Sequence, residues 1–281
     1  MNFLYGTLTS AAPLLLASTG ALVSEYSGAM AIFLDGLITL SAFFCFAFTI
    51  WTKSFLLGIF LAIFAGLSFT ALMALLIEKL NANRFLAALA LNLIYASLST
   101  TFSSIFFGTR GVLTNQAFVF MPEKARLITN FFAYLVFLCI YLLLKHTKTG
   151  LYIRICGSDP QVLHAKGINI FKIRLYAWII AAALGSCAGC IMSIRLSSFV
   201  PNISSGTGWT ALAAVFLAKK NTAAIAGAVL AFLLTQYGAN NLQNIEAFKS
   251  LPPSFLLSLP YISALLLILF FPQIQQRKLK L

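Results

Sequence analysis

The sequence has few charged residues and very few acids. Only 6 of its 281 residues are Asp or Glu, all charged residues together make up 9%, and hydrophobic residues make up 60%. The mean hydropathy is +0.95. Soluble domains carry about 25% charged residues, so this composition excludes an ordinary soluble protein. It predicts an integral membrane protein.

The chain also lacks the motifs that several kinds of active site require. No G-x-x-x-x-G-K-[ST] phosphate-binding loop occurs in it, so we do not expect the chain to hydrolyse ATP by that route. His146 and His164 lie apart from any group of carboxylates, and Cys187 and Cys190 have no second Cys or His pair near them in sequence. We therefore expect no catalytic residue, no metal and no cofactor.

Long apolar runs dominate what is present. About 20 helical residues cross the hydrocarbon of a membrane, and the chain offers eight or nine apolar runs. They cover approximately residues 4–23, 30–51, 55–77, 85–107, 127–144, 175–194, 209–218, 222–234 and 255–271. This pattern predicts an all-α, polytopic membrane bundle of about eight to ten transmembrane helices, forming a single domain over residues 1–281. Because the run at 209–218 has only about ten residues, we expect a half-helix or a re-entrant segment there.

The net charge of +13 indicates membrane topology. The basic residues lie between apolar runs, where they orient the helices and contact anionic lipid, so we expect no nucleic-acid partner. Residues 145–174 are the densest basic interval, with Asp159 as their single acid and six bases: Lys145, Lys148, Arg154, Lys166, Lys172 and Arg174. The positive-inside rule places this interval in the cytoplasm. With nine crossings, the amino-terminus then lies outside and the carboxy-terminus inside.

A short helix is predicted within this interval. Asp159 can cap a helix and Pro160 suits its first position, while Gly167 is typical of the residue just beyond a helix end. These residues predict a helix over 160–166, and Asn169 can cap the helix that follows.

A helix of about seven residues is unstable alone in water, so it needs a surface to pack on. Its apolar residues are Val162, Leu163 and Ala165. From these residues alone, two interpretations have equal weight. One is a solvated loop that sets topology and touches lipid, and the other is a docking helix for a cytosolic protein.

Some residues within the apolar runs also attract attention. Asp35 and Asn92 are candidates for a translocation path, although a backbone hydrogen bond for Asp35 and a link between helices for Asn92 are the simpler interpretations. Small residues recur at every fourth position of the run at 175–194, which places them on one helix face where another helix can approach closely. They are Ala181, Gly185, Gly189 and Ser193.

A family resemblance decides between the interpretations of the basic interval. The segments that carry it there are Gly150-Leu151, Arg154, Gly157, Asp159-Pro160, residues 165–169 (Ala-Lys-Gly-Ile-Asn) and Arg174-Leu175. This pattern resembles the coupling-helix region of the membrane subunits of ABC importers, in the branch that handles simple sugars and nucleosides. Further segments of the chain look like that family's recurrent segments, in the expected order: residues 12–17, 22–25, 34–36, Asn83 with 89–93, and 211–215.

The resemblance implies a permease subunit of a bacterial ABC importer, in the inner membrane, without enzymatic activity of its own. It implies a cytosolic ABC ATPase docked at Asp159, Pro160, Val162, Leu163, Ala165, Lys166, Gly167 and Asn169. It also implies a second homologous permease subunit and an extracytoplasmic substrate-binding protein or lipoprotein. The implied substrate is a nucleoside or a simple sugar, with riboflavin as a competitor.

Two segments depart from the family pattern. Residues 31–36 read Ala-Ile-Phe-Leu-Asp-Gly where the family commonly has Asn-Ile-Gly-Leu-Glu-Gly, and residues 219–222 replace the usual Gly-Gly-Trp-Arg-Pro turn. An alternative of another class is an ion-coupled secondary transporter. Such a transporter should carry several acids inside the membrane, and this chain offers only Asp35.

Overall fold

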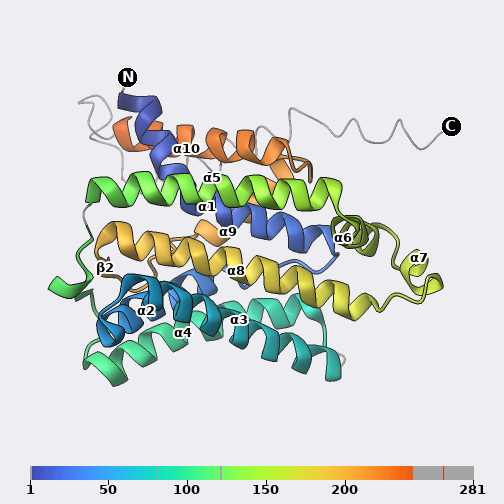
Figure 1. The fold of residues 1–281 in the computed structure, drawn as a ribbon, viewed down its shortest axis with the longest axis horizontal. Coiled ribbons are helices and arrows are strands. Elements are labelled where there is room, and N and C mark those ends of the chain that lie inside the picture. The colour runs from blue at the N-terminus through green and yellow to red at the C-terminus, as the bar shows by residue number, and fades with distance from the viewer. Residues whose placement is uncertain (1, 81, 121, 243–261, 263–281) are drawn as a thin grey trace.

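The protein folds as a bundle of long helices, as a computed structural model shows for residues 2–80, 82–120, 122–242 and 262 (Figure 1). In order, the elements are α1 (Asn2–Tyr26), α2 (Leu34–Thr52), α3 (Phe55–Lys79), α4 (Arg84–Phe107), β1 (Leu113–Thr114), the 3₁₀ helix η1 (Gln116–Phe118), α5 (Pro122–His146), α6 (Lys148–Ser158), α7 (Pro160–Ala165), α8 (Ile170–Leu196), β2 (Ser198–Phe199), α9 (Thr207–Leu217) and α10 (Ala224–Leu242). The predicted all-α bundle is confirmed. The predicted last run, 255–271, lies outside the described residues except for Ile262.

Five of the described helices are long and apolar enough to cross a membrane: α2, α3, α4, α8 and the Arg126–His146 part of α5. The bundle has two distinct ends (Figure 1). At one end, which we call the α7 end, lie α6 and α7. At the other, the β end, β1 and β2 pair antiparallel, with Leu113 opposite Phe199. The chain is therefore a multi-pass membrane protein.

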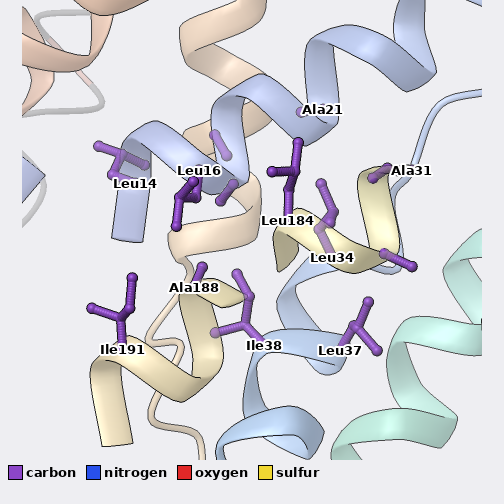
Figure 2. Close-up of a cluster of buried hydrophobic side chains, with 14 of the residues drawn as sticks. Leu14, Leu16, Ala21, Ala31, Leu34, Leu37, Ile38, Leu184, Ala188 and Ile191 are labelled. Atoms are coloured by element: carbon purple, nitrogen blue, oxygen red, sulfur yellow. The ribbon is translucent and has the colours of Figure 1, made fainter. Parts of the chain in front are cut away.

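The core lies where α1, α2 and α8 meet. Figure 2 shows Leu16 of α1, Ile38 of α2 and Ala188 of α8 among the side chains of this cluster. In contrast, α3, α4 and α5 expose large apolar side chains such as Phe60 and Phe131, which suit contact with lipid. The three central helices thus form the support on which the remaining elements are arranged.

The small residues of α8 lie where this helix approaches its neighbours most closely. A Cβ atom on Gly189 would overlap the carbonyl oxygen of Ile38 in α2, and one on Gly185 would lie 2.7 Å from Leu34 Cδ2. The backbone of Ala181 faces Gly20 of α1. Ser193 donates a hydrogen bond of 3.2 Å to the carbonyl oxygen of Ser198. Small side chains at these positions let α8 pack closely on both of the other central helices.

The short run at 209–218 becomes the half-helix α9. Its 11 residues span about 16 Å, roughly half the thickness of the hydrocarbon. The chain leaves α8 at the β end, passes through the non-helical residues 200–206, and completes the crossing with α9. The turn after α9 contacts the end of α1 through Lys220 and Glu25. Lys219 and Lys220 therefore lie at the α7 end, together with the basic interval.

Candidate functional site

Helix α7 begins at the residue that the sequence indicates and ends one residue earlier. Asp159 accepts a hydrogen bond of 3.1 Å from the backbone amide of Gln161, and Pro160 occupies the first helical position. At the other end, Gly167 has a φ of +71°, which favours glycine, and its amide donates to the carbonyl oxygen of His164 at 2.9 Å. The helix is one residue shorter than predicted because Lys166 already serves as its cap.

The apolar residues of α7 lie in different environments. Leu163 is completely buried within the chain, whereas Val162 is 40% exposed and Ala165 is exposed as well. The helix packs against α6 and α8. Leu163 therefore fixes α7 to its own chain, whereas Val162, Ala165 and Lys166 are among the residues exposed on its outer surface.

The residue that precedes α8 helps to orient this helix. The side-chain oxygen of Asn169 accepts a hydrogen bond of 3.3 Å from the amide of Lys172, so Asn169 caps α8 as predicted. Helix α7 is thus tied to a central helix of the bundle by a connection of four residues, 166–169.

Helix α6 connects this region to the end of α1. A Cβ atom on Gly157 would overlap the carbonyl oxygen of Tyr26, so only glycine allows this close approach. The Arg154 guanidinium lies 6.0 Å from the centre of the Tyr26 ring. Cys156, which lies between Arg154 and Gly157 in sequence, is buried. Burial raises the pKa of its thiol, and the nearby Arg174 guanidinium lowers this pKa in part.

Asp35 and Asn92 both hold the amino-terminal turn of another helix. The Asp35 carboxylate accepts a hydrogen bond of 2.9 Å from the amide of Gly208, in the first turn of α9. Asn92 accepts one of 2.6 Å from the amide of Gly36, in the first turn of α2. Such amides have no partner within their own helix, and a negative charge near them is favoured by the helix dipole. Both residues therefore bind backbone within the bundle.

A polar cavity of about 270 Å³ lies between α1, α8, α9 and α10, beside the start of the half-helix. Its apolar lining comes from Pro13, Leu14, Met192 and Leu233. Seven further lining residues are polar: Thr7, Ser10, Ser205, Thr207, Thr210, Gln236 and Tyr237. None of the described lining residues is a Lys, Arg, His, Asp or Glu. Neither Asp35 nor Asn92 is among them.

Several hydroxyls of the cavity donate to their own backbone. Ser10 donates to the carbonyl oxygen of Gly6 at 2.9 Å, Ser205 to that of Asn202 at 3.2 Å, and Thr210 to that of Thr207 at 2.9 Å. A hydroxyl oxygen that donates in this way still has lone pairs with which it accepts hydrogen bonds. The cavity therefore offers neutral acceptors to a ligand that carries hydroxyl or amide donors.

Sequence reasoning missed this cavity. Its polar residues are scattered over three helices, α1, α9 and α10, and the loop before α9, and each alone is an ordinary residue for a membrane helix. The one available signal was the short run at 209–218, because half-helices inside membranes often border substrate sites.

A membrane-spanning bundle with a half-helix, a polar cavity beside it and a short helix outside one end defines a membrane permease. Residues 3–271 match the family described as the branched-chain amino acid transport system / permease component. The chain belongs to this family, and it is an ABC transporter permease.

Several curated proteins are similar to this chain. The nucleoside ABC transporter permease protein NupC of Lactococcus lactis is 25% identical over 283 residues, covering 92% of this chain and 88% of that protein. The guanosine ABC transporter permease protein NupQ of Bacillus subtilis is 27% identical over 284 residues, with the same coverage of both. The putative glucose ABC transporter permease protein TsgC13 of Haloferax volcanii is 28% identical over 237 residues, covering 78% and 70%.

The fold also resembles that of a solved structure, PsaBC from Streptococcus pneumoniae in complex with Fab. The TM-score is 0.54 at 18% sequence identity, and the match covers 100% of this chain and 95% of that chain. The family and the sequence relatives, rather than this likeness of fold, favour the permease over the alternative of an ion-coupled secondary transporter. The family to which this chain belongs is described as a transport component rather than as an enzyme.

Proposed function

We propose that this permease carries a nucleoside or a simple sugar, and that the substrate passes through the cavity beside α9. The observation that carries the proposal is the neutral, hydrogen-bonding lining of that cavity. A free amino acid would bring an ammonium and a carboxylate, which are costly to place inside a membrane without charged partners. A sugar or nucleoside brings hydroxyl donors that match the acceptors of Ser10, Ser205 and Thr210. The similarity to nucleoside and glucose permeases supports the same substrate class.

A separate cytosolic ATPase drives the transport by docking on α7, over residues Asp159 to Asn169. These 281 residues contain no phosphate-binding loop, which supports ATP hydrolysis by a separate subunit. Val162 and Ala165 provide an exposed apolar contact, and the buried Leu163 holds the helix against the bundle so that it resists the force of the ATPase. The cluster of bases around α7 supports a cytoplasmic position for this end.

A second homologous permease subunit covers the cavity. Helices α9 and α10 carry polar cavity residues, such as Thr210 and Gln236, next to exposed apolar ones, such as Trp209 and Phe216. A polar wall is unfavourable against lipid, and a protein partner would remove it from the hydrocarbon. At the β end, an extracytoplasmic substrate-binding protein delivers the substrate. The assembly lies in the inner membrane of a bacterium.

Uptake measurements test the substrate class. Cells that express the permease with the second permease subunit, the ATPase and the binding protein should accumulate labelled guanosine, uridine, ribose or glucose, and excess unlabelled substrate should block this uptake. Leucine and riboflavin should neither enter nor compete. Uptake of leucine or riboflavin in place of these four compounds would overturn the proposal.

Two variants connect the uptake to the cavity. Thr210→Val removes a lining hydroxyl and should raise the KM for uptake several-fold, as expected for one lost hydrogen bond of about 1 kcal/mol. The matched control is Thr235→Val in α10, because Thr235 donates to the carbonyl oxygen of Phe232 at 2.8 Å and does not line the cavity. Equal KM values in both variants would contradict a substrate path at this place.

A further inference from the structure

We infer that the half-helix α9 is the element that links the ATPase-docking end to the cavity, and that Glu25 and Tyr26 are the positioning residues that transmit the movement. This inference rests on the proposed function, because it assumes that an ATPase moves α7. It concerns residues at the end of α1, which touch neither the cavity nor the outer surface of α7.

The turn after α9 is held by the last residues of α1. The Lys220 ammonium lies 2.6 Å from the Glu25 carboxylate, whose side chain is only 8% exposed. The Tyr26 hydroxyl donates to the carbonyl oxygen of Lys220 and lies 3.2 Å from the Thr222 hydroxyl. Thus two consecutive residues of one helix hold both the side chain and the backbone of Lys220.

This turn has a backbone conformation that residues other than glycine rarely adopt. Lys219 and Lys220 have φ angles of +51° and +56°, both in the left-handed region that favours glycine. Such a conformation persists only where surrounding contacts hold it. Glu25 and Tyr26 supply contacts of this kind, so the position of the turn depends on the position of the end of α1.

The other end of α9 is held within the bundle. Asp35 of α2 accepts from the amide of Gly208, and Thr39 of α2 donates to the hydroxyl of Ser204 just before the helix, at 3.0 Å. Thr207 and Thr210, on either side of Gly208, line the cavity. Any displacement of the turn at Lys220 therefore tilts α9 about its attachment to α2 and changes the cavity wall.

The end of α1 also touches the helix that precedes the docking helix. Gly157 of α6 packs directly on the backbone of Tyr26 and Gly28, and Arg154 of α6 lies over the Tyr26 ring. Only Asp159 separates the end of α6 at Ser158 from the start of α7 at Pro160. Tyr26 thus contacts α6 with its backbone and ring, and the turn after α9 with its hydroxyl. A continuous chain of contacts runs from α7 through α6 and Tyr26 to α9.

The ion pair makes this chain stiff. A buried carboxylate that loses its partner remains as an uncompensated charge, so Glu25 and Lys220 resist separation. They move together when α1 or α6 moves. A second ion pair at the same end, between Glu78 and Arg84 at 3.1 Å, provides a comparison, because its carboxylate is 35% exposed, against 8% for that of Glu25. Pairs whose carboxylate is accessible to solvent contribute less, and this pair joins α3 to α4 rather than α1 to the turn after α9.

The labelling rate of a cysteine in the cavity measures the movement. Thr210→Cys is introduced into a permease whose five native cysteines are replaced by serine, and this permease is purified in the complex with the ATPase that it retains. The rate of reaction with a water-soluble maleimide is then measured without nucleotide and with ATP and orthovanadate. In this parent complex we expect the two rates to differ at least fivefold. Adding Glu25→Gln or Tyr26→Phe should reduce the difference to less than twofold.

The variants are chosen to separate transmission from folding. Tyr26→Phe removes only the hydroxyl and keeps the ring beside Arg154, so its fold should be retained even where Glu25→Gln loosens the turn. The exchange of charges in Glu25→Lys with Lys220→Glu should restore most of the difference. The matched control Glu78→Gln should behave as the parent does.

The outcomes distinguish this inference from the proposed function. A parent complex that retains no ATPase overturns the proposed function and this inference with it. A parent complex that retains the ATPase, together with parental labelling differences in both Glu25→Gln and Tyr26→Phe, overturns the inference alone. An equal reduction in Glu78→Gln also overturns it, because the effect would then not depend on the contact with α9.

Discussion

The side-chain oxygen of Asn92 in α4 accepts a hydrogen bond of 2.6 Å from the backbone amide of Gly36 in the first turn of α2. A Cβ atom on Gly36 would overlap the backbone of Asn92, so the two helices meet at this point without an intervening side chain. The bond satisfies an amide that has no acceptor within α2. It also fixes the start of α2, and Asp35 in the same turn holds α9. Asn92 thus supports the half-helix α9 indirectly, because it holds the turn of α2 whose Asp35 binds Gly208.

Replacing Asn92 by Ala should destabilise the bundle. The change leaves a buried amide without an acceptor, and we expect a cost of about 1–2 kcal/mol. Asn92→Asp keeps an acceptor and should cost less only if the carboxyl remains protonated. Asn92→Gln is too long to serve as a control, and Asn115→Ala is used instead. Asn115 caps η1 through a bond of 2.8 Å in an exposed loop. Thermal unfolding in detergent should show a clear decrease for Asn92→Ala and little change for Asn115→Ala.

The close approach of α8 to α2 leads to a second prediction. In Gly189→Ala the added methyl group meets the carbonyl oxygen of Ile38, and the helices must separate to admit it. Overpacking of this kind costs about 1–3 kcal/mol and should lower the unfolding temperature. The control is Gly227→Ala in α10, where no atom lies within 4 Å of the added carbon. There, alanine should leave stability unchanged or raise it by up to about 1 kcal/mol. A lower unfolding temperature for Gly227→Ala alone would contradict this account.

Much of the fold could be predicted because its signals are local. The apolar run at 55–77 corresponds to α3, Phe55–Lys79, because length and hydropathy alone specify such a helix. The limits of α7 follow from Asp159 and Gly167, whose effects on the backbone act over two or three residues. These features need no knowledge of which helices are neighbours.

The cavity and the contact at Lys220 could not be predicted, because the residues that form them lie far apart in sequence. Tyr26 and Lys220 are 194 positions apart in sequence, and no property of either residue indicates the other. Similarly, Leu163 has the same apolar character as Val162, and only the packing of α7 on α6 and α8 buries one and exposes the other. The docking and path residues therefore remain predictions until they are measured.

The buried thiol at the junction of α6 with α1 gives a third prediction. The thiolate is the reactive form of cysteine, and burial raises the pKa of Cys156, so little thiolate is present at neutral pH. In a variant whose other cysteines are replaced by serine, maleimide should label Cys156 slowly at pH 7 and faster as the pH rises above the usual range of a thiol. After the protein is unfolded in a denaturing detergent, labelling should be rapid both at pH 7 and at the higher pH. Rapid labelling of the folded protein at pH 7 would show that the junction is open.

The outer surface of α7 gives the last prediction. Val162→Asp places a charge at an exposed apolar position of the proposed ATPase contact, while Leu163 beneath it still holds the helix in place. We expect the variant to fold normally and to lose the co-purifying ATPase, because burying an unpaired carboxylate in an interface is costly. Val112→Asp is the matched control, since Val112 is an exposed valine in the loop at the β end. If both variants retain the ATPase equally, α7 is not the docking helix. If both lose it, the loss reflects damage to the permease rather than to one surface. Loss in Val162→Asp alone, with an unchanged unfolding temperature, locates the contact on α7, because the two substitutions add the same charge and differ only in the end of the bundle that receives it.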